Sequence, residues 1–182
     1  MANAVLDPTG KVSSKRAVQA SRRPDLRGAT VGLLVNTKRN ADLFLEELGR
    51  LLVDREGAAD VVTRRKTGPI TAPAPDEVVE EMAGQCDVVV TGVGDCGSCS
   101  AAAVADGLLF EGRGIPSAVV CSDAFTATSD AMARVQGAPG YRYATTPHPV
   151  AVLTPDEVRE RAGRALPDVV SLMVAVEQRG AA

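Results

Sequence analysis

Tryptophan is absent from this chain of 182 residues, and aromatic residues make up only 3% of it. So few aromatic rings argue against a surface that stacks nucleic-acid bases. A formal net charge of −3 gives no reason to expect a polyanionic partner. No apolar run approaches the roughly 18 residues that a membrane span needs. We therefore expect a protein that binds neither nucleic acid nor membranes.

Cysteine and histidine are also scarce, with four cysteines and one histidine. Four cysteines are too few for a disulfide scaffold at this length, and the first residues show no signal-peptide pattern. We expect a cytoplasmic protein whose thiols are free, catalytic or metal-bound. The length and the 45% of hydrophobic residues suit one globular domain with a single core.

Residues 1–28 differ from the rest of the chain, because they show no sustained periodicity and carry an excess of basic side chains. Six basic residues stand against two acidic ones: Lys11, Lys15, Arg16, Arg22, Arg23 and Arg27 against Asp7 and Asp25. We interpret the segment as a basic N-terminal arm, followed by an α/β domain over residues 29–182. The arm is either a solvated or partner-packed tail, or an element that lies over a neighbouring subunit or an acidic ligand. Because such an arm can pack on a neighbouring subunit, we expect the protein to form a homo- or hetero-oligomer.

From residue 29 onward, strand patterns alternate with helix patterns. The apolar runs predict strands over 29–36, 59–65, 86–93, 117–122 and 141–145. Helices are expected from Asn40, which we interpret as a cap, after Pro75, over 98–112 and over 124–135. A last helix is expected from Thr154, a capping residue that the acid Glu157 follows three positions later. This alternation predicts a single three-layer α/β/α sandwich with a parallel sheet of about five strands, flavodoxin-like or like half of an Asp/Glu racemase.

Ligands of such sheets bind at the carboxyl ends of the strands. The residues that follow the predicted strands form a polar, reactive set: Asn36 and Lys38; Asp95, Cys96, Ser98 and Cys99; Cys121, Ser122 and Phe125; and His148. Three of the four cysteines and the only histidine thus fall on one edge. Cys86 opens a strand instead, and we interpret it as structural.

The segment from Gly94 to Cys99 is the strongest functional signal. A thiol in the first turn of a helix is stabilised as the thiolate by the unpaired backbone N–H groups. Cys96 and Cys99 are three residues apart, so they can face each other and close a disulfide. The charge of Asp95 opposes thiolate formation unless this carboxylate orients a partner such as Lys38 or His148. A Cys-x-x-Cys between a strand and a helix is a redox signal.

Three other interpretations remain open for this segment. Gly92, Gly94 and Gly97 match the dinucleotide fingerprint, although no ribose-binding acid follows about 20 residues later. Cys96, Cys99, Cys121 and His148 are acceptable zinc ligands, but a second Cys-x-x-Cys or a histidine pair is missing. The thiols could also be inert and buried. We favour thiol chemistry that uses no metal and no cofactor.

The remaining residues of the edge have supporting roles in this hypothesis. His148 stands between Pro147 and Pro149, which fix its backbone, and is expected to be the acid/base partner of Cys96. Lys38 and Asn36 would hold a carboxylate, although Lys38 could simply be solvated. Ser98, Ser122 and Phe125 are expected to line the substrate site. Cys121 is either a second catalytic thiol or a buried residue at a strand end.

Several stretches of this sequence resemble the UGSC family of (seleno)proteins, named for a selenocysteine-Gly-Ser-Cys motif in which cysteine often replaces selenocysteine. They are Asp-Cys-Gly-Ser-Cys at 95–99, Gly-Ile-Pro-Ser at 114–117, Cys-Ser-Asp-Ala-Phe at 121–125, Pro-His-Pro at 147–149 and the opening segment 31–42. The resemblance runs from about residue 28 to the last helix. It places the selenocysteine-equivalent position on Cys96 and the resolving thiol on Cys99.

The motif is also distantly similar to the selenoprotein subunits of the glycine reductase type, which cleave a C–N bond reductively. This resemblance implies that Cys96 attacks a substrate, that Cys99 resolves the adduct as a disulfide, and that a cellular dithiol reduces the pair again. The sequence therefore predicts a cysteine-dependent oxidoreductase or lyase that acts on a small carboxylate-bearing metabolite. The alternatives are a thiol-based isomerase, dehydratase or lyase without net redox change, and a non-catalytic subunit of a hetero-oligomeric enzyme.

Overall fold

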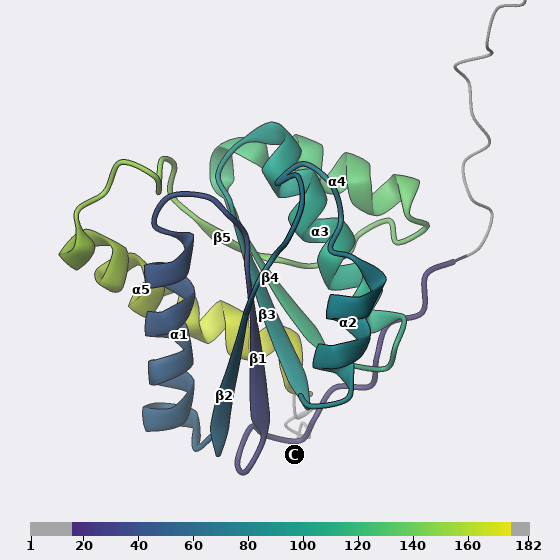
Figure 1. Cartoon of the computed structure of the whole chain (residues 1–182), viewed down its shortest axis with the longest axis vertical. Helices are drawn as coiled ribbons and strands as arrows, with labels where there is room; N and C mark the ends of the chain where they lie inside the picture. Colours follow the sequence, from purple (N-terminus) through teal and green to yellow (C-terminus); the bar gives the residue numbers. More distant parts are fainter. Residues whose placement is uncertain (1–15, 176–182) are drawn as a thin grey trace, which may run out of the picture.

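The computed structural model describes residues 16–175, in which strands and helices alternate along the chain (Figure 1). The strands are β1 (Thr30–Val35), β2 (Asp60–Arg65), β3 (Val88–Gly94), β4 (Ser117–Ser122) and β5 (Ala144–Thr146). The helices are α1 (Ala41–Glu56), α2 (Asp76–Ala83), α3 (Gly97–Glu111), α4 (Thr126–Val135) and α5 (Pro155–Met173), with a 3-10 turn η1 (Asp123–Phe125) before α4.

The five strands form one parallel sheet in the order β2-β1-β3-β4-β5. Every residue of β3 and β4 is buried, as expected for central strands that helices cover on both faces. The predicted α/β sandwich with a parallel five-stranded sheet is therefore confirmed.

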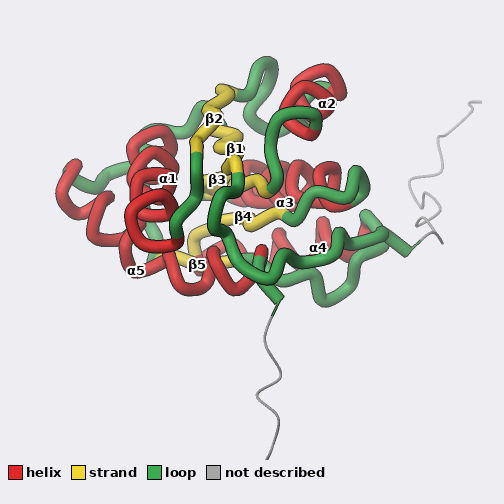
Figure 2. The backbone as a smooth tube through the Cα atoms, turned by 90° about the horizontal axis from the view of Figure 1, so that it is seen from below, coloured by secondary structure: helices red, strands yellow, loops and turns green. Residues whose placement is uncertain are grey.

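The helices divide between the two faces of the sheet. Figure 2 shows α1 and α5 on one side of the strands and α2, α3 and α4 on the other. Side chains alternate accordingly along β1: Val31 and Leu33 pack in the core cluster of α1 and α5, whereas Leu34 packs with α2 and with Phe110 of α3. The continuous apolar runs in the sequence reflect burial on both faces.

Part of the predicted basic arm packs on the domain. Arg23 forms a parallel bridge with Val174, and Leu26 is buried in the main core cluster. The Arg22 guanidinium and the Ala20 backbone N–H donate to the fully buried Glu111 carboxylate, at 2.8 and 2.7 Å. Residues 16–28 thus belong to the folded unit, and residues 1–15 of the predicted arm lie outside the described residues.

The ends of the helices agree only partly with the sequence signals. Thr154 and Glu157 form the expected capping box at the start of α5. Asn40 holds the predicted N-cap position of α1, and its carbonyl accepts the Phe44 N–H at 3.0 Å, but its side chain makes no capping bond and its backbone has a left-handed φ of 68°. The helix predicted from residue 124 begins at Thr126, since Asp123–Phe125 forms the 3-10 turn.

The strand order creates a switch point between β1 and β3. β1 leads into α1 on one face, and β3 leads into α3 on the other, so the loops that follow these strands diverge. Ligands of open parallel sheets bind at such a point, outside the carboxyl ends of the strands. Asn36 and Lys38 follow β1, and Asp95 and Cys96 follow β3. Within residues 16–175, no helix combines the length and apolar character needed to cross a membrane.

Candidate active site

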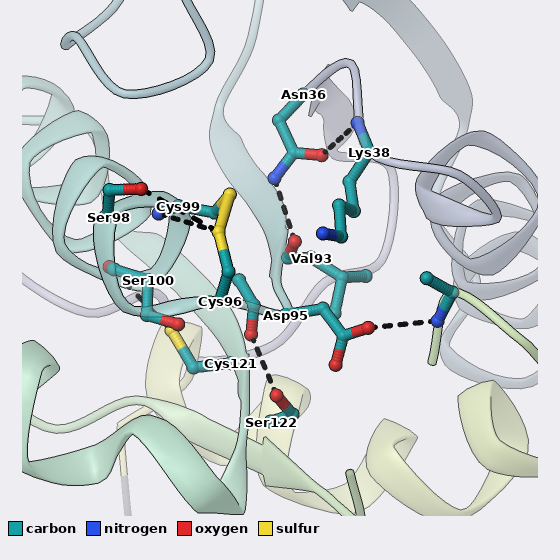
Figure 3. Close-up of a disulfide and its surroundings, with 12 residues drawn as sticks. Asn36, Lys38, Val93, Asp95, Cys96, Ser98, Cys99, Ser100, Cys121 and Ser122 are labelled. Carbon is teal, nitrogen blue, oxygen red and sulfur yellow. Dashed lines mark hydrogen bonds between the residues drawn. A yellow bond between two sulfur atoms is a disulfide. The ribbon is translucent and has the colours of Figure 1, made fainter. Parts of the chain in front are cut away.

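A disulfide between Cys96 and Cys99 closes the first turn of α3 (Figure 3). Cys96 is the N-cap residue of this helix, and its sulfur accepts the backbone N–H of Cys99 at 3.3 Å. The Ser98 hydroxyl lies 3.7 Å from the same sulfur. Cys96 is half-buried, whereas Cys99 is only 3% exposed. The disulfide thus joins one partly exposed cysteine to one buried cysteine.

Gly94 allows β3 and α3 to pack closely enough to place this turn. A Cβ atom at Gly94 would lie 2.6 Å from Ser100 Cα, a distance that real side chains do not adopt. The second glycine of the formal dinucleotide fingerprint is therefore explained by packing of the strand against the helix. It gives no separate support to a nucleotide site.

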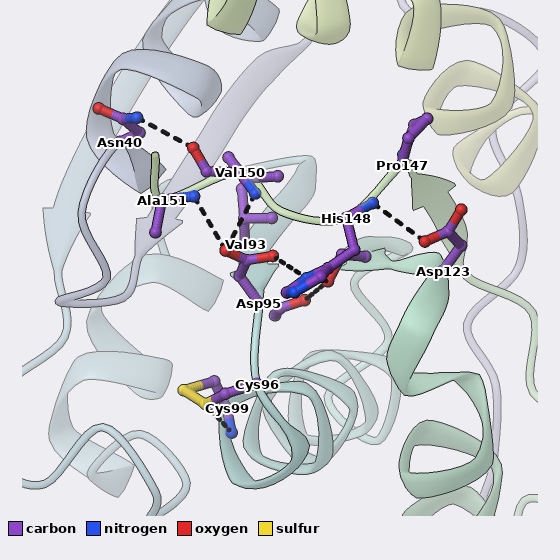
Figure 4. Close-up of polar contacts among 12 residues, drawn as sticks. Asn40, Val93, Asp95, Cys96, Cys99, Asp123, Pro147, His148, Val150 and Ala151 are labelled. Carbon is purple, nitrogen blue, oxygen red and sulfur yellow. Dashed lines mark hydrogen bonds and ion pairs between the residues drawn. A yellow bond between two sulfur atoms is a disulfide. The ribbon is translucent and has the colours of Figure 1, made fainter. Parts of the chain in front are cut away.

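Asp95 directs its carboxylate away from the disulfide and into a buried network (Figure 4). Its Oδ2 accepts the backbone N–H groups of Val150 and Ala151 at 3.0 and 2.9 Å. Its Oδ1 accepts the Nδ1–H of His148 at 2.9 Å. Three donors thus balance the negative charge beside Cys96. Asp95 orients His148, and no hydrogen bond connects its carboxylate to Lys38.

Among residues 16–175, His148 has hydrogen-bond partners at Nδ1 and at its backbone N–H but none at Nε2. Its Nδ1 also lies 3.4 Å from the Ser122 hydroxyl, which donates to the Gly94 carbonyl. The Phe125 ring packs against the imidazole in an edge-on geometry, with centroids 5.2 Å apart. The His148 backbone N–H donates to Asp123 at 3.0 Å. The side chain is 37% exposed, so the free Nε2 can act as a proton acceptor.

The imidazole and the disulfide share one edge of the sheet without touching. Within residues 16–175, no hydrogen bond connects His148 to Cys96 or Cys99. Although Asp95 and Cys96 are neighbours in the sequence, Figures 3 and 4 show their side chains pointing in different directions. The expected direct contact between Cys96 and His148 is therefore not present in this oxidised state.

Asn36 and Lys38 occupy the other side of the switch point. The buried Asn36 amide donates to the Val93 carbonyl at 2.8 Å, and its oxygen accepts the Lys38 backbone N–H at 3.0 Å. Asn36 thus fixes the loop, and the residue is only 5% exposed. The ammonium of Lys38 forms no ion pair with any described residue. Figure 3 shows the Lys38 side chain beside Val93, near the carboxyl end of β3.

A family model for the UGSC family matches residues 4–175. The chain belongs to the UGSC family. No curated protein matches it. A solved structure of an ABC transporter permease from the Pseudomonas fluorescens group is similar over 79% of this chain and 32% of its own length, at 16% identity and a TM-score of 0.42. The chain thus spans about a third of that protein, and so weak a likeness carries no functional inference.

Cys121 of this UGSC-family chain is unsuited to be a second nucleophile. It is completely buried, and desolvation raises the pKa of its thiol to about 11. A protonated thiol without access to solvent is chemically inert near neutral pH. Of the two roles expected for Cys121, the structure supports the buried residue at a strand end. Cys86 is likewise buried, and burial raises the pKa of its thiol.

The UGSC-family chain also contains a buried charge pair that the sequence pattern does not indicate. Lys66 follows Arg64 and Arg65 at the end of β2, where three consecutive basic residues are typical of a solvated edge, but its side chain is 2% exposed. It pairs with Asp106 at 2.6 Å, and Asp106 also accepts the Ala74 backbone N–H. An acid flanked by apolar residues in the middle of α3, in the run Ala-Val-Ala-Asp-Gly-Leu-Leu, was the available signal.

The four residues considered as zinc ligands are not gathered in one place. Cys96 and Cys99 are joined to each other, Cys121 is buried beneath α3, and His148 binds Asp95. Within the part of the chain that the structure describes, no group of three or more histidine, cysteine or acidic side chains could hold a metal ion. The arrangement of these side chains therefore gives no support to the zinc interpretation.

Proposed function

We propose that this UGSC-family protein is a thiol-dependent enzyme in which Cys96 and Cys99 form a redox pair. The observation that carries the proposal is the disulfide in the first turn of α3, with Cys96 partly exposed and Cys99 buried. In such a pair, the accessible sulfur reacts with the substrate and the protected one resolves the adduct. Family membership supports the motif as a unit but names no reaction.

The helix terminus supports Cys96 as the nucleophile. In the reduced protein, a thiolate at this position would keep the hydrogen bond from the Cys99 N–H and would face the positive end of the α3 dipole. Both effects favour the charged form of the sulfur. The opposing charge of Asp95 is already balanced by three hydrogen-bond donors.

The Asp95–His148 pair supplies the proton acceptor and donor. The carboxylate holds the Nδ1–H tautomer, which leaves Nε2 free to exchange protons with a substrate. Since His148 does not contact either cysteine, we propose that it acts on a substrate bound between them. The Ser122 hydroxyl and the Phe125 ring contact the imidazole and help to orient it.

Lys38 defines the substrate class. Its ammonium lies at the switch point, opposite Cys96, without an ionic partner among the described residues. A small metabolite with a carboxylate would pair with it and place its α-carbon near the sulfur. Asn36 contributes by fixing the Lys38 loop and would not itself bind the anion.

The reaction balances as a two-electron reduction. The Cys96 thiolate bonds to the α-carbon and displaces the leaving group X, which departs with one proton as HX. Cys99 then attacks the Cys96 sulfur, the carbon–sulfur bond breaks, and the carbon keeps the electron pair and takes the second proton. The substrate R–X becomes R–H and HX, and the two thiols become the disulfide. A cellular dithiol reduces the disulfide and is itself oxidised.

Iodoacetate and iodoacetamide test this proposal because they differ only in the carboxylate. We expect reduced protein to favour iodoacetate at Cys96, and Lys38→Met to lower the ratio of the two rates about threefold to fivefold, as for a partly exposed charge pair. Arg39→Ala, an exposed position in the same loop, is the matched control. An unchanged ratio in Lys38→Met would reject the carboxylate site.

The fate of the adduct tests the redox step. We expect the carboxymethyl group on Cys96 to persist in Cys99→Ser and to be released as acetate in the parent protein, with formation of the disulfide. Intact-mass spectrometry distinguishes the two states. Equal persistence in both proteins would favour the second candidate, a thiol isomerase, dehydratase or lyase without net redox change. The oriented Asp95–His148 pair is the observation that favours this second function.

A further inference from the structure

Asn40 connects two loops that meet at the carboxyl edge of the sheet. It ends the loop that carries Lys38, and its amide nitrogen donates to the carbonyls of Val150 and Leu153, both at 3.0 Å. These carbonyls belong to the loop between β5 and α5, more than 100 residues away in the sequence. Figure 4 shows Asn40 above this loop, on the side opposite the disulfide.

The second loop positions the Asp95–His148 pair. The N–H groups of Val150 and Ala151 donate to one oxygen of Asp95, and the other oxygen accepts the His148 Nδ1–H. The same short segment therefore presents carbonyls to Asn40 and N–H groups to Asp95. A change at Asn40 would shift the donors of Asp95 and, through them, the imidazole.

Two properties of asparagine suit this position. The backbone φ of 68° lies in the left-handed region, which asparagine tolerates better than most residues. The amide supplies two N–H donors for two carbonyl acceptors. Glycine would keep the backbone but lose both bonds, and aspartate would bring a negative oxygen against two carbonyls.

We infer that Asn40 is a positioning residue that fixes the orientation and tautomer of His148 through the 150–153 loop. It touches neither cysteine and is not expected to contact the substrate. Its consequence for turnover rests on the proposed function, but its effect on the imidazole does not. The two claims can therefore be tested separately.

The single histidine of the chain allows a direct test. In protein containing ¹⁵N-labelled histidine, a long-range ¹H–¹⁵N spectrum at alkaline pH should show the Nδ1–H tautomer, opposite to the preference of free imidazole side chains. We expect Asn40→Gly to raise the Nε2–H fraction, and Asn40→Asp to raise it further. The Val150 and Ala151 amides should exchange about tenfold faster in Asn40→Gly, as expected when one or two neutral hydrogen bonds are lost.

Control variants and control amides separate a local effect on His148 from a loss of overall stability. Arg39→Ala should leave the histidine spectrum unchanged. If Asn40→Asp fails to fold, Asn40→Gly alone decides the outcome. Unchanged tautomer and exchange in Asn40→Gly would overturn the inference, and so would faster exchange spread evenly over the β3 amides, because that indicates a loss of overall stability only. The iodoacetamide rate at Cys96 should stay within about twofold of the parent in Asn40→Gly, because this reagent has no carboxylate and Asn40 contacts neither cysteine. The histidine spectrum is recorded without substrate, so it stands whether or not the thiol chemistry is confirmed.

Discussion

Asp95 and Cys96 show how two adjacent side chains that both carry a negative charge, a carboxylate and a thiolate, can belong to one site. A carboxylate next to a reactive thiol would disfavour the thiolate if both faced the same space. Here the carboxylate is buried among the Val150 and Ala151 N–H groups and the His148 imidazole. The sulfur faces the helix terminus instead. The two side chains can therefore serve different steps of one reaction.

Cys121 provides a pH-dependent prediction at the scale of one residue. Its thiol has a pKa raised from 9.0 to about 11 by burial, so the folded protein keeps this proton more tightly than the unfolded chain does. The stability that this contributes is present below pH 9 and is lost as the pH rises toward 11, by up to about 2–3 kcal/mol. Urea unfolding of the parent and of Cys121→Ala at pH 7, 9 and 11 measures the difference.

Cys121→Ala should be less stable than the parent at pH 7, because a buried side chain is shortened. Between pH 9 and 11, however, it should lose less stability than the parent loses. Parallel declines of the two proteins over this interval would contradict the burial-raised pKa of Cys121.

At the scale of elements, the junction of β3 and α3 determines where the disulfide lies. Gly94→Ala should destabilise the protein by about 2 kcal/mol or more, because the new methyl group would clash with Ser100 Cα at 2.6 Å. Gly97→Ala is the matched control, since its Cβ would meet only Thr128 Cγ2 at 3.6 Å. It should be neutral or slightly stabilising. Equal losses in thermal unfolding would contradict this packing.

The strands and most helices were predictable because their signals are local. Continuous apolar runs predicted β1, β3 and β4, and the Thr154–Glu157 capping box predicted the start of α5. The role of Asn40 was not predictable in this way. Its hydrogen-bond acceptors lie more than 100 residues further along the chain, so its side chain bonds the β5–α5 loop instead of capping α1.

At the scale of the whole molecule, the Lys66–Asp106 pair ties the end of β2 to α3. Asp106→Asn or Lys66→Met alone should cost about 3–5 kcal/mol, because either change leaves one buried charge without its partner. The double variant should recover most of this loss, since the asparagine can still accept the Ala74 N–H. Urea unfolding measures all three variants.

Glu160→Gln in the exposed Arg164–Glu160 pair is the control for this series and should change stability by less than about 1 kcal/mol. A double variant no more stable than the single ones would contradict the pairing of Lys66 with Asp106. Desolvation raises the pKa of Asp106, which agrees with a charge retained in the core only through its partner.

The candidate site was predictable as an edge of the sheet but not as a set of contacts. Parallel topology brings all the strand ends together, so the sequence positions of Cys96, Lys38 and His148 were enough to place them at one edge. Topology does not specify the directions of side chains in the loops. For this reason the separation of the imidazole from the disulfide, and the burial of Lys66, emerged only from the structure.

The rate of alkylation of Cys96 across pH is the measurement that most directly tests the proposed thiol chemistry. The protein is reduced, treated with iodoacetamide between pH 5.5 and 9, and digested for quantification of each cysteine by mass spectrometry. We predict that Cys96 reacts below pH 7 at least about tenfold faster than a simple thiol with a pKa near 8.5. A Cys96 profile that matches the simple thiol would contradict the account.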